Sequence, residues 1–482
     1  DDSPTARARG ILDWYGRDRT FAVPILTQVA LAGGRKTPSA WSLFPALPFE
    51  AGLIPRRFYQ AIRLPVVSYA LPALLALGLC HAHQAPPRNP LLRLIRRLAR
   101  PRALHLLTQL QPESGGYLEA IPLTAFVVMA LTGAGNGAHP VAQRGLTFLR
   151  AGRRPDGSWP IDTHLATWLT SLAIAAGAQG RSSHAPLLAT RREALTRWLL
   201  DRQWKRTHPF TLSPPGGWAW TPHAGGVPDA DDTAAALIAL CRLNPGSTEV
   251  QNAAVHGMRW LFHIQNADGG IPTFCAGWQN LPFDRSAPDL TAHALRALAA
   301  VWPFLPPADR RRGVRFTDRA LTFLAGTQRR DGCWIPLWFG HQRHPRGQNP
   351  VHGTSRVLLA LAAVPAHLQP RIADLRARGR AWLLAAVQSD GGWGGAPEGP
   401  SGCEETALAL EALAVDAHPD AHAVVERGYR RLARFFENPD RVQPQPIGFY
   451  FASLWYSEAL YPWIFAWAAA RAAPDAGSSP AV

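Results

Sequence analysis

The chain has 482 residues, of which 47% are hydrophobic and 18 are tryptophan, and it carries a formal net charge of +16. This length and apolar content exclude a largely disordered protein and predict two or three domains. The five cysteines form no Cys-X-X-Cys pair, which argues against a disulfide scaffold or a zinc ribbon and fits a reducing compartment.

The region from about residue 39 to 107 is apolar but interrupted by proline and arginine. Its run VVSYALPALLALGLC has 15 residues, fewer than the roughly 20 needed to cross a bilayer. The stretch RNPLLRLIRRLARPRALHLL (88–107) then places Leu and Ile at helical spacing with Arg between them. That pattern is typical of a helix lying on an anionic membrane surface. We interpret the region as dipping into a membrane without crossing it, with a buried helix pair as the alternative. No nucleic-acid motif accompanies the basic charge, so no nucleic-acid partner is expected.

A pattern of about sixty residues recurs from residue 145 onward. A helical segment leads into a polar turn with glycine and an aromatic residue, as in ALTFLAGTQRRDGCW (320–334) and GRAWLLAAVQSDGGW (379–393). A second helix follows that is apolar around most of its circumference, which predicts that it is buried. We mark the turns by Gly157, Gly217, Gly270, Gly332 and Gly392.

About six such helix pairs predict an all-α fold in which inner helices close into a ring wrapped by outer ones, an α/α barrel. No strands are expected. We place an N-terminal α-barrel-type domain, incomplete and containing the membrane-dipping segment, at 1–160, and the main barrel at 161–475.

Three carboxylates, Asp229, Asp231 and Asp232, stand directly before one of the apolar helices. A single aspartate would be explained as a helix cap, but three neighbouring carboxylates resist ionising together. The N-termini of parallel inner helices share one end of the ring, so the cluster is expected at the end of a central cavity. Alignment of Thr291 with Thr233 places His293 at the same rim.

The chemistry of such a site follows from its surroundings. In an apolar, aromatic cavity at least one carboxyl should stay protonated and act as an acid. A matching substrate is a hydrocarbon whose C=C bond takes up the proton. The resulting carbocation is stabilised by aromatic faces and protected by the exclusion of water.

These features together resemble the class II terpene cyclases, and squalene-hopene cyclases most of all. The motif DADDTA (229–234), the turns of the type QSDGGW (388–393), the segment FAVPILTQVALAGG (21–34) and the C-terminal stretch GFYFASLWYSEALYPWIFAWAAAR (448–471) carry the resemblance. It implies that an acyclic polyprene such as squalene is converted to a hopene-type polycyclic product without a cofactor or metal. It also implies a monotopic protein on the cytoplasmic face of the inner membrane, and leaves a homodimer open.

Residue roles also follow from the resemblance. It implies that Asp231 is the proton donor, that Asp229 and Asp232 support it, and that His293 hydrogen-bonds to it. The aromatic residues that match positions near the acid, on the cavity wall or at a late cation are Trp220, Trp260, Trp168, Trp338, Phe274 and Tyr450.

The sequence departs from the family pattern in four respects. His352 replaces a tyrosine near the acid, Pro446 stands where an aromatic residue is expected, and Leu64 replaces a tryptophan. From the resemblance we also expect the chain to begin inside the family's longer N-terminal region. Because of these departures, the resemblance does not determine which product is formed or which substrate is used.

Three alternatives stay open. The first is a cyclase of a shorter prenyl diphosphate, which needs basic residues or Mg²⁺ to hold the diphosphate. The second is a ring resembling a protein prenyltransferase β-subunit, which needs Asp, Cys and His ligands for zinc. Cys241 and Cys275 are available, but Cys241 lies in an apolar helix, where a buried thiol is expected. The third is a non-catalytic lipid-binding ring, if the incomplete N-terminal part has removed the activity. Separately, a packing role for each tryptophan and a core role for His293 stay open.

Overall fold

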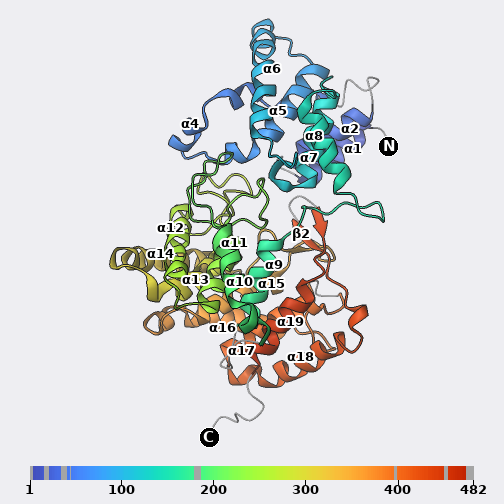
Figure 1. Ribbon diagram of the computed structural model, residues 1–482. Coiled ribbons are helices and arrows are strands. Elements are labelled where there is room, and N and C mark those ends of the chain that lie inside the picture. The colour runs from blue at the N-terminus through green and yellow to red at the C-terminus, as the bar shows by residue number, and fades with distance from the viewer. Residues whose placement is uncertain are drawn as a thin grey trace. The chain divides into compact units, whose positions relative to one another are not determined.

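The computed structural model describes residues 4–15, 21–33, 41–43, 45–178, 186–395, 399–449 and 454–473. The chain forms two compact units. Unit 1 takes residues 1–165 together with 208–212 and 221–227, and unit 2 takes 166–207, 213–220 and 228–482. Unit 1 is drawn mainly in blue and unit 2 in green to red (Figure 1).

Unit 1 is built from helices packed around α5 (Val66–Gln84). This helix contacts α2 (Ala22–Ala32), α6 (Pro90–Leu110) and α7 (Ile121–Gly133). The remaining elements are α1 (Pro4–Tyr15), η2 (Phe49–Leu53), α4 (Arg56–Ala61), η3 (Tyr117–Glu119) and α8 (Pro140–Ala151). The position of α5 at the centre of these contacts makes it the core helix of the unit.

Helix α5 continues beyond the apolar run identified in the sequence. It has 19 residues with a mean hydropathy of 1.5, and among the described residues it alone is long and apolar enough to cross a membrane. However, 67% of this stretch is buried inside the protein, as is also usual for a core helix. The membrane-dipping interpretation therefore stays a prediction.

Two later segments of the chain pack within unit 1. The guanidinium of Arg56 donates to the carbonyl oxygens of Pro209 and Phe210, at 2.6 and 2.5 Å. The carboxylate of Glu119 accepts from the backbone N–H of Gly225 at 3.0 Å. These bonds show why 208–212 and 221–227 group with unit 1, which a single boundary at residue 160 does not capture.

Unit 2 forms a ring of inner helices. Within its described residues these are α9 (Ala166–Gly177), α11 (Ala230–Leu243), α13 (Pro288–Val301), α15 (Pro350–Ala362), α17 (Cys403–Asp416) and α19 (Tyr461–Ala472). Each packs against the next, and α19 packs against α9 to close the ring. The outer helices are α10 (Pro186–Arg202), α12 (Thr248–Ile264), α14 (Pro307–Thr327), α16 (Gln369–Ala385) and α18 (His422–Phe435). The predicted all-α fold with an α/α barrel is confirmed.

The glycine-aromatic turns tie each outer helix to the following inner helix. The turn aromatic donates its backbone N–H to a threonine hydroxyl in the next inner helix, in the pairs Trp218–Thr233 (2.9 Å), Trp334–Thr354 (3.1 Å) and Trp393–Thr406 (3.0 Å). The indole N–H groups donate to the carbonyl oxygens of Leu199, Leu324 and Leu383, each at 2.8 Å. The turns thus fix where each inner helix begins.

A positive φ is required in these turns. Gly332 has φ +100°, and a Cβ there would lie 2.6 Å from the carbonyl oxygen of Arg378, so glycine meets both a conformational and a steric need. Gly157 is likewise at positive φ. In the other three turns the residue with positive φ is Gly216, Gly269 or Gly391, one position before the glycine that we used as a marker.

The expectation of no strands is wrong in one place. A small antiparallel sheet joins β1 (Gly340–His341), β2 (Ile447–Phe449) and β3 (Leu454–Tyr456). Gly448 pairs with Trp455 and has φ +151°, and a Cβ there would lie 2.1 Å from the carbonyl oxygen of Leu454. These strands are only two or three residues long, so no alternating pattern was visible to identify them.

Candidate active site

The three aspartates of the DADDTA motif have different positions. Asp229 is the N-cap of α11, and its Oδ1 accepts the backbone N–H groups of Asp231 and Asp232, both at 2.9 Å. Asp229 and Asp232 are buried, whereas 19% of the Asp231 side chain is exposed. One aspartate therefore satisfies the helix end, and Asp231 in the first turn is left to face a cavity.

Asp231 is paired with His293 of α13. Its Oδ1 lies 2.5 Å from Nδ1 of the imidazole. Burial lowers the pKa of His293, an effect that the Asp231 carboxylate opposes. The equivalent threonines Thr233 and Thr291 start their helices in the same way, each accepting a backbone N–H from the preceding turn. The repeat placed His293 at the same rim as Asp231, the resemblance implied a hydrogen bond between them, and the structure shows that contact.

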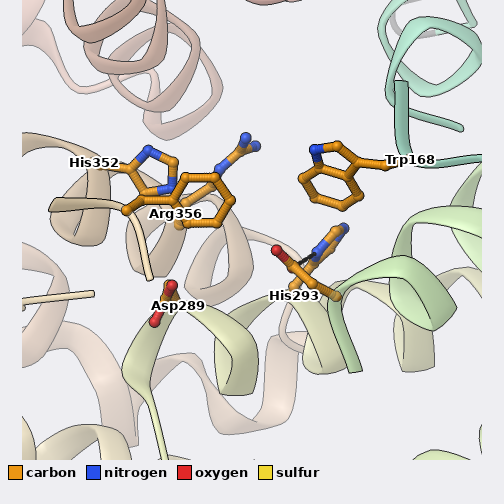
Figure 2. Close-up of a pocket in the computed structure, with 7 residues that line it drawn as sticks. Trp168, Asp289, His293, His352 and Arg356 are labelled. Atoms are coloured by element: carbon orange, nitrogen blue, oxygen red, sulfur yellow. Dashed lines mark hydrogen bonds and ion pairs between the residues drawn. The ribbon is translucent and has the colours of Figure 1, made fainter. Parts of the chain in front are cut away.

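A small cavity of about 10 Å³ adjoins this pair, room for about one water molecule. Its lining comes from four inner helices and one connecting segment, and consists of Trp168, Asp231, Asp289, His293, Phe339, His352 and Arg356 (Figure 2).

Aromatic rings pack around the acid. The ring of Trp168 lies edge-on to His293 with centroids 6.1 Å apart, and 6.4 Å from Phe339. Phe339 stacks on His352 at 4.4 Å. The indole N–H of Trp168 donates to Oη of Tyr461 at 2.8 Å. Trp168 is therefore held in place by a hydrogen bond at one edge, and its ring borders the cavity beside the acid.

Two of the carboxyl groups near Asp231 are poor anions at neutral pH. Burial raises the pKa of Asp229 to about 7, with a further contribution from the charge of Asp231. Burial and the charge of Asp231 also raise the pKa of Asp289 to about 7. We did not identify Asp289 from the sequence, although it stands two residues before Thr291, as Asp231 stands before Thr233.

The raised pKa of Asp289 predicts a pH-dependent stability. Because this pKa is above its ordinary value of 3.8, the folded protein binds a proton that the unfolded chain releases between pH 3.8 and about 7. Stability from this group is complete below that window and is lost as pH rises through it, by up to about 1.4 kcal/mol per pH unit. We expect Asp289→Asn to remove this contribution. The free energy of unfolding of the wild type and of Asp289→Asn is measured with urea across this pH window. If the two free energies change with pH in parallel, the prediction is contradicted.

The other aromatic residues of the predicted site form a second group. Ring contacts of 4.5 to 6.2 Å connect, in order, Trp220, Phe274, Phe283, Trp338, Phe449 and Tyr456. The indole N–H of Trp338 donates to the hydroxyl of Thr273. Three members of this group, Phe283, Phe449 and Tyr456, were missed in the sequence, because only folding brings their segments together.

Trp260 does not belong to either group. It lies on the outer helix α12, is almost fully buried, and donates its indole N–H to Oγ of Ser213 at 3.1 Å. A Cβ at Gly217 would lie 3.0 Å from its ring. This placement favours a packing role for Trp260. Tyr450 lies outside the described residues.

The cysteines considered as zinc ligands are buried. Burial raises the pKa of the Cys241 thiol to about 12 and that of Cys275 well above its ordinary value. A zinc ligand must be a thiolate, so these surroundings disfavour the protein prenyltransferase alternative. Within the described part of the chain, no three His, Cys, Asp or Glu side chains are placed to hold a metal together.

A closed helical ring with an aspartate–histidine pair among aromatic rings at its rim is the arrangement of a class II terpene cyclase. Residues 165–434 match the family model for the squalene-hopene cyclase C-terminal domain. The chain belongs to this family.

Curated relatives support the same family. An enfumafungin synthase from Hormonema carpetanum is 30% identical over 63% of this chain and 24% of its own length. A probable squalene-hopene cyclase from Sinorhizobium fredii is 31% identical over 45% and 35%. A drimenyl diphosphate synthase from Streptantibioticus cattleyicolor is 32% identical over 65% and 55%. The chain thus spans about a quarter to a half of the length of these relatives.

A solved structure shows the same fold over nearly the whole chain. The ent-copalyl diphosphate synthase from Streptomyces platensis has a TM-score of 0.55 and 20% sequence identity, covering 98% of this chain and 92% of that one.

Proposed function

We propose that this chain is a protonation-initiated cyclase of an acyclic polyprene, with Asp231 as the proton donor. The observation that carries the proposal is the 2.5 Å contact between Asp231 and His293 at a small cavity bordered by Trp168 and Phe339. Of the three aspartates, Asp229 caps the helix, Asp232 is buried outside the cavity lining, and Asp231 borders the cavity.

The reaction follows from these positions. The π electrons of a C=C bond form a new C–H bond with the carboxyl proton of Asp231, which leaves a carboxylate and a tertiary carbocation. A neighbouring C=C bond attacks the cation, forms a C–C bond and moves the charge along the chain, and loss of a proton ends the sequence. One proton enters and one leaves, so the product is an isomer of the substrate. Aromatic faces near the path stabilise the charge.

We propose squalene as the substrate and a hopene-type triterpene as the product. The named squalene-hopene cyclase relative and the family model support this choice. The relative named as a drimenyl diphosphate synthase supports a second candidate, a shorter prenyl diphosphate.

Product analysis separates the two candidates. Purified protein is incubated with squalene, farnesyl diphosphate or geranylgeranyl diphosphate, and cyclic products are identified by mass spectrometry, with the Asp231→Asn variant as the blank. We expect cyclic product from squalene. Product from a diphosphate alone would show that the substrate is a prenyl diphosphate and would leave the proposed protonation mechanism in place. If none of the three compounds gives a cyclic product, the cyclase proposal is contradicted.

We also propose that unit 1 associates with the anionic cytoplasmic face of the inner membrane through α6. This helix has a buried face with Ala99, Ala103 and Leu107. A second apolar stripe points away from that core, and its residues Leu91, Leu94, Ile95 and Leu98 are exposed by 64, 52, 44 and 67%. The helix has no acidic residue and carries exposed arginines. An exposed apolar stripe among basic residues matches an anionic lipid surface.

Vesicle binding tests this surface. We expect Leu94→Ser with Leu98→Ser to reduce binding to anionic vesicles, whereas Val314→Ser, which alters an equally exposed residue on α14, should leave binding unchanged. Arg93→Gln with Arg97→Gln should weaken binding at low salt, at about 1 kcal/mol per arginine. The membrane proposal is wrong if the wild type does not bind anionic vesicles. It is also wrong if the double leucine variant, like the valine variant, binds as strongly as the wild type.

A further inference from the structure

A cluster of charged side chains, one of them buried and three half-buried, lies on the inner helices of the ring. It consists of Arg242 on α11, Arg296 on α13, Arg356 on α15 and Glu411 on α17. Arg296 Nη2 lies 3.9 Å from a Glu411 carboxylate oxygen. Burial lowers the pKa of Arg296 to about 10; the charge of Glu411 opposes this shift, and the charges of Arg242 and Arg356 add to it. The apolar pattern of the inner helices predicts hydrocarbon side chains at these positions, so the presence of charged side chains there requires an explanation.

The charges of this cluster do not balance. The cluster holds three guanidinium groups and one carboxylate, and ions withdrawn from water without partners are costly. Arg242 donates to the carbonyl oxygen of Ala175 at 2.5 Å. Arg356 makes no ion pair within the described part of the chain, and its guanidinium lies 5.2 Å from the ring centroid of Phe465. The excess positive charge is therefore available to act on neighbouring groups.

The nearest titratable neighbours are the histidines of the active-site cavity. Arg296 follows His293 by three residues on α13, and Arg356 follows His352 by four residues on α15, so each arginine lies one turn beyond a histidine on the same helix face. Arg356 lines the cavity together with both histidines (Figure 2). The charged and titratable groups that bear on His293 from its own and adjoining helices are Asp231, Asp289, Arg296, His352 and Arg356.

Both arginines oppose protonation of the imidazoles. Burial lowers the pKa of His293, Asp231 opposes this, and the charges of Arg296 and Arg356 lower it further. Burial, then Arg356 and His293, hold the pKa of His352 well below its ordinary value. At a contact of 2.5 Å, one proton shared by Asp231 and His293 can rest on either partner. Only when it rests on the carboxyl can Asp231 give it to a C=C bond.

We infer that Arg296 and Arg356 are positioning residues that hold His293 as a neutral imidazole and thereby keep the catalytic proton on Asp231. The catalytic consequence rests on the proposed function, whereas the state of His293 is a property of the resting protein. Glu411 anchors Arg296 in the cluster, and the ring of Phe465 supports Arg356.

Nitrogen NMR of histidine-labelled protein tests this inference without any substrate. The His293 signals are identified as those missing from the His293→Gln variant. In the wild type we expect the shifts of a neutral imidazole at neutral pH. In Arg296→Gln and in Arg356→Gln we expect the proton affinity of His293 to rise about tenfold or more, because a nearby half-buried cation has been removed.

Two controls separate charge from packing. Arg356→Lys keeps the charge and should keep His293 neutral. Arg376→Gln alters an arginine that pairs with Asp416 on the outer side of the ring, and it should leave the His293 titration unchanged.

The inference is overturned if wild-type His293 is an imidazolium at neutral pH. It is overturned equally if folded Arg296→Gln and Arg356→Gln titrate as the wild type does, or if Arg356→Lys behaves as Arg356→Gln. An imidazolium in the wild-type spectrum overturns the inference even if a glutamine variant fails to fold. Failure of the proposed function shows itself separately, as the absence of cyclic product while the titrations still follow the expected order.

Discussion

Asp231→Asn is expected to abolish cyclisation while the protein stays folded. The amide has nearly the same shape and can still bond to His293, but it has no acidic proton to give to a C=C bond. Loss of general acid catalysis should reduce turnover at least about a thousandfold. The measurement is product formation per mole of folded protein, with circular dichroism and thermal unfolding as checks on the fold.

Asp229→Asn is the matched control for this substitution. An asparagine still caps α11, since its side-chain oxygen can accept the N–H groups of Asp231 and Asp232. It removes one buried carboxyl but leaves the donor, so its activity should fall less than that of Asp231→Asn. Equal activity in Asp231→Asn and the wild type would show that another group supplies the proton.

Trp168→Phe is expected to change the product mixture. Its indole borders the acid cavity and is fixed by the bond to Tyr461. A desolvated cation–aromatic contact is worth about 2 kcal/mol. Phenylalanine keeps a smaller aromatic face and loses the bond to Tyr461, so the ratio of partly cyclised or water-captured products to the complete product should rise by up to about thirtyfold, the value for complete loss of the contact. Gas chromatography with mass spectrometry measures this ratio.

Trp260→Phe provides the comparison for Trp168→Phe. It changes the same residue type to the same replacement, but on an outer helix, where the indole bonds to Ser213. We expect lower thermal stability and an unchanged product ratio. If Trp168→Phe also loses only rate or stability, Trp168 is a packing residue and the assignment of a cation-stabilising role is wrong.

The part of the site that repeats in sequence was predictable. DDTA and DLTA align at Thr233 and Thr291, and these threonines occupy equivalent bonds to the preceding turns. Because each turn fixes the start of its inner helix, alignment of two repeats was enough to bring Asp231 and His293 to the same rim.

Features that depend on closure of the ring were not predictable. Arg356 lies within the apolar helix GTSRVLLAL, where nothing local reveals that it faces a cavity with two histidines. Phe339 reaches the acid cavity from a connecting segment, and Phe449 joins the second aromatic group from a short strand. The interpretation of Trp260 as a residue near the acid came from the family resemblance alone. The position of Trp260 on the outer helix α12 favours a packing role instead.

The origin of the first proton is the most direct test of the whole account. The reaction is run in D₂O with the substrate that is turned over, and the product is analysed by mass spectrometry and NMR. Because the Asp231 carboxyl exchanges with solvent between turnovers, the account predicts one deuterium in each product molecule, on the carbon of the first C=C bond. A cyclic product without deuterium would contradict it, since the cation would then have formed by loss of a leaving group and not by protonation.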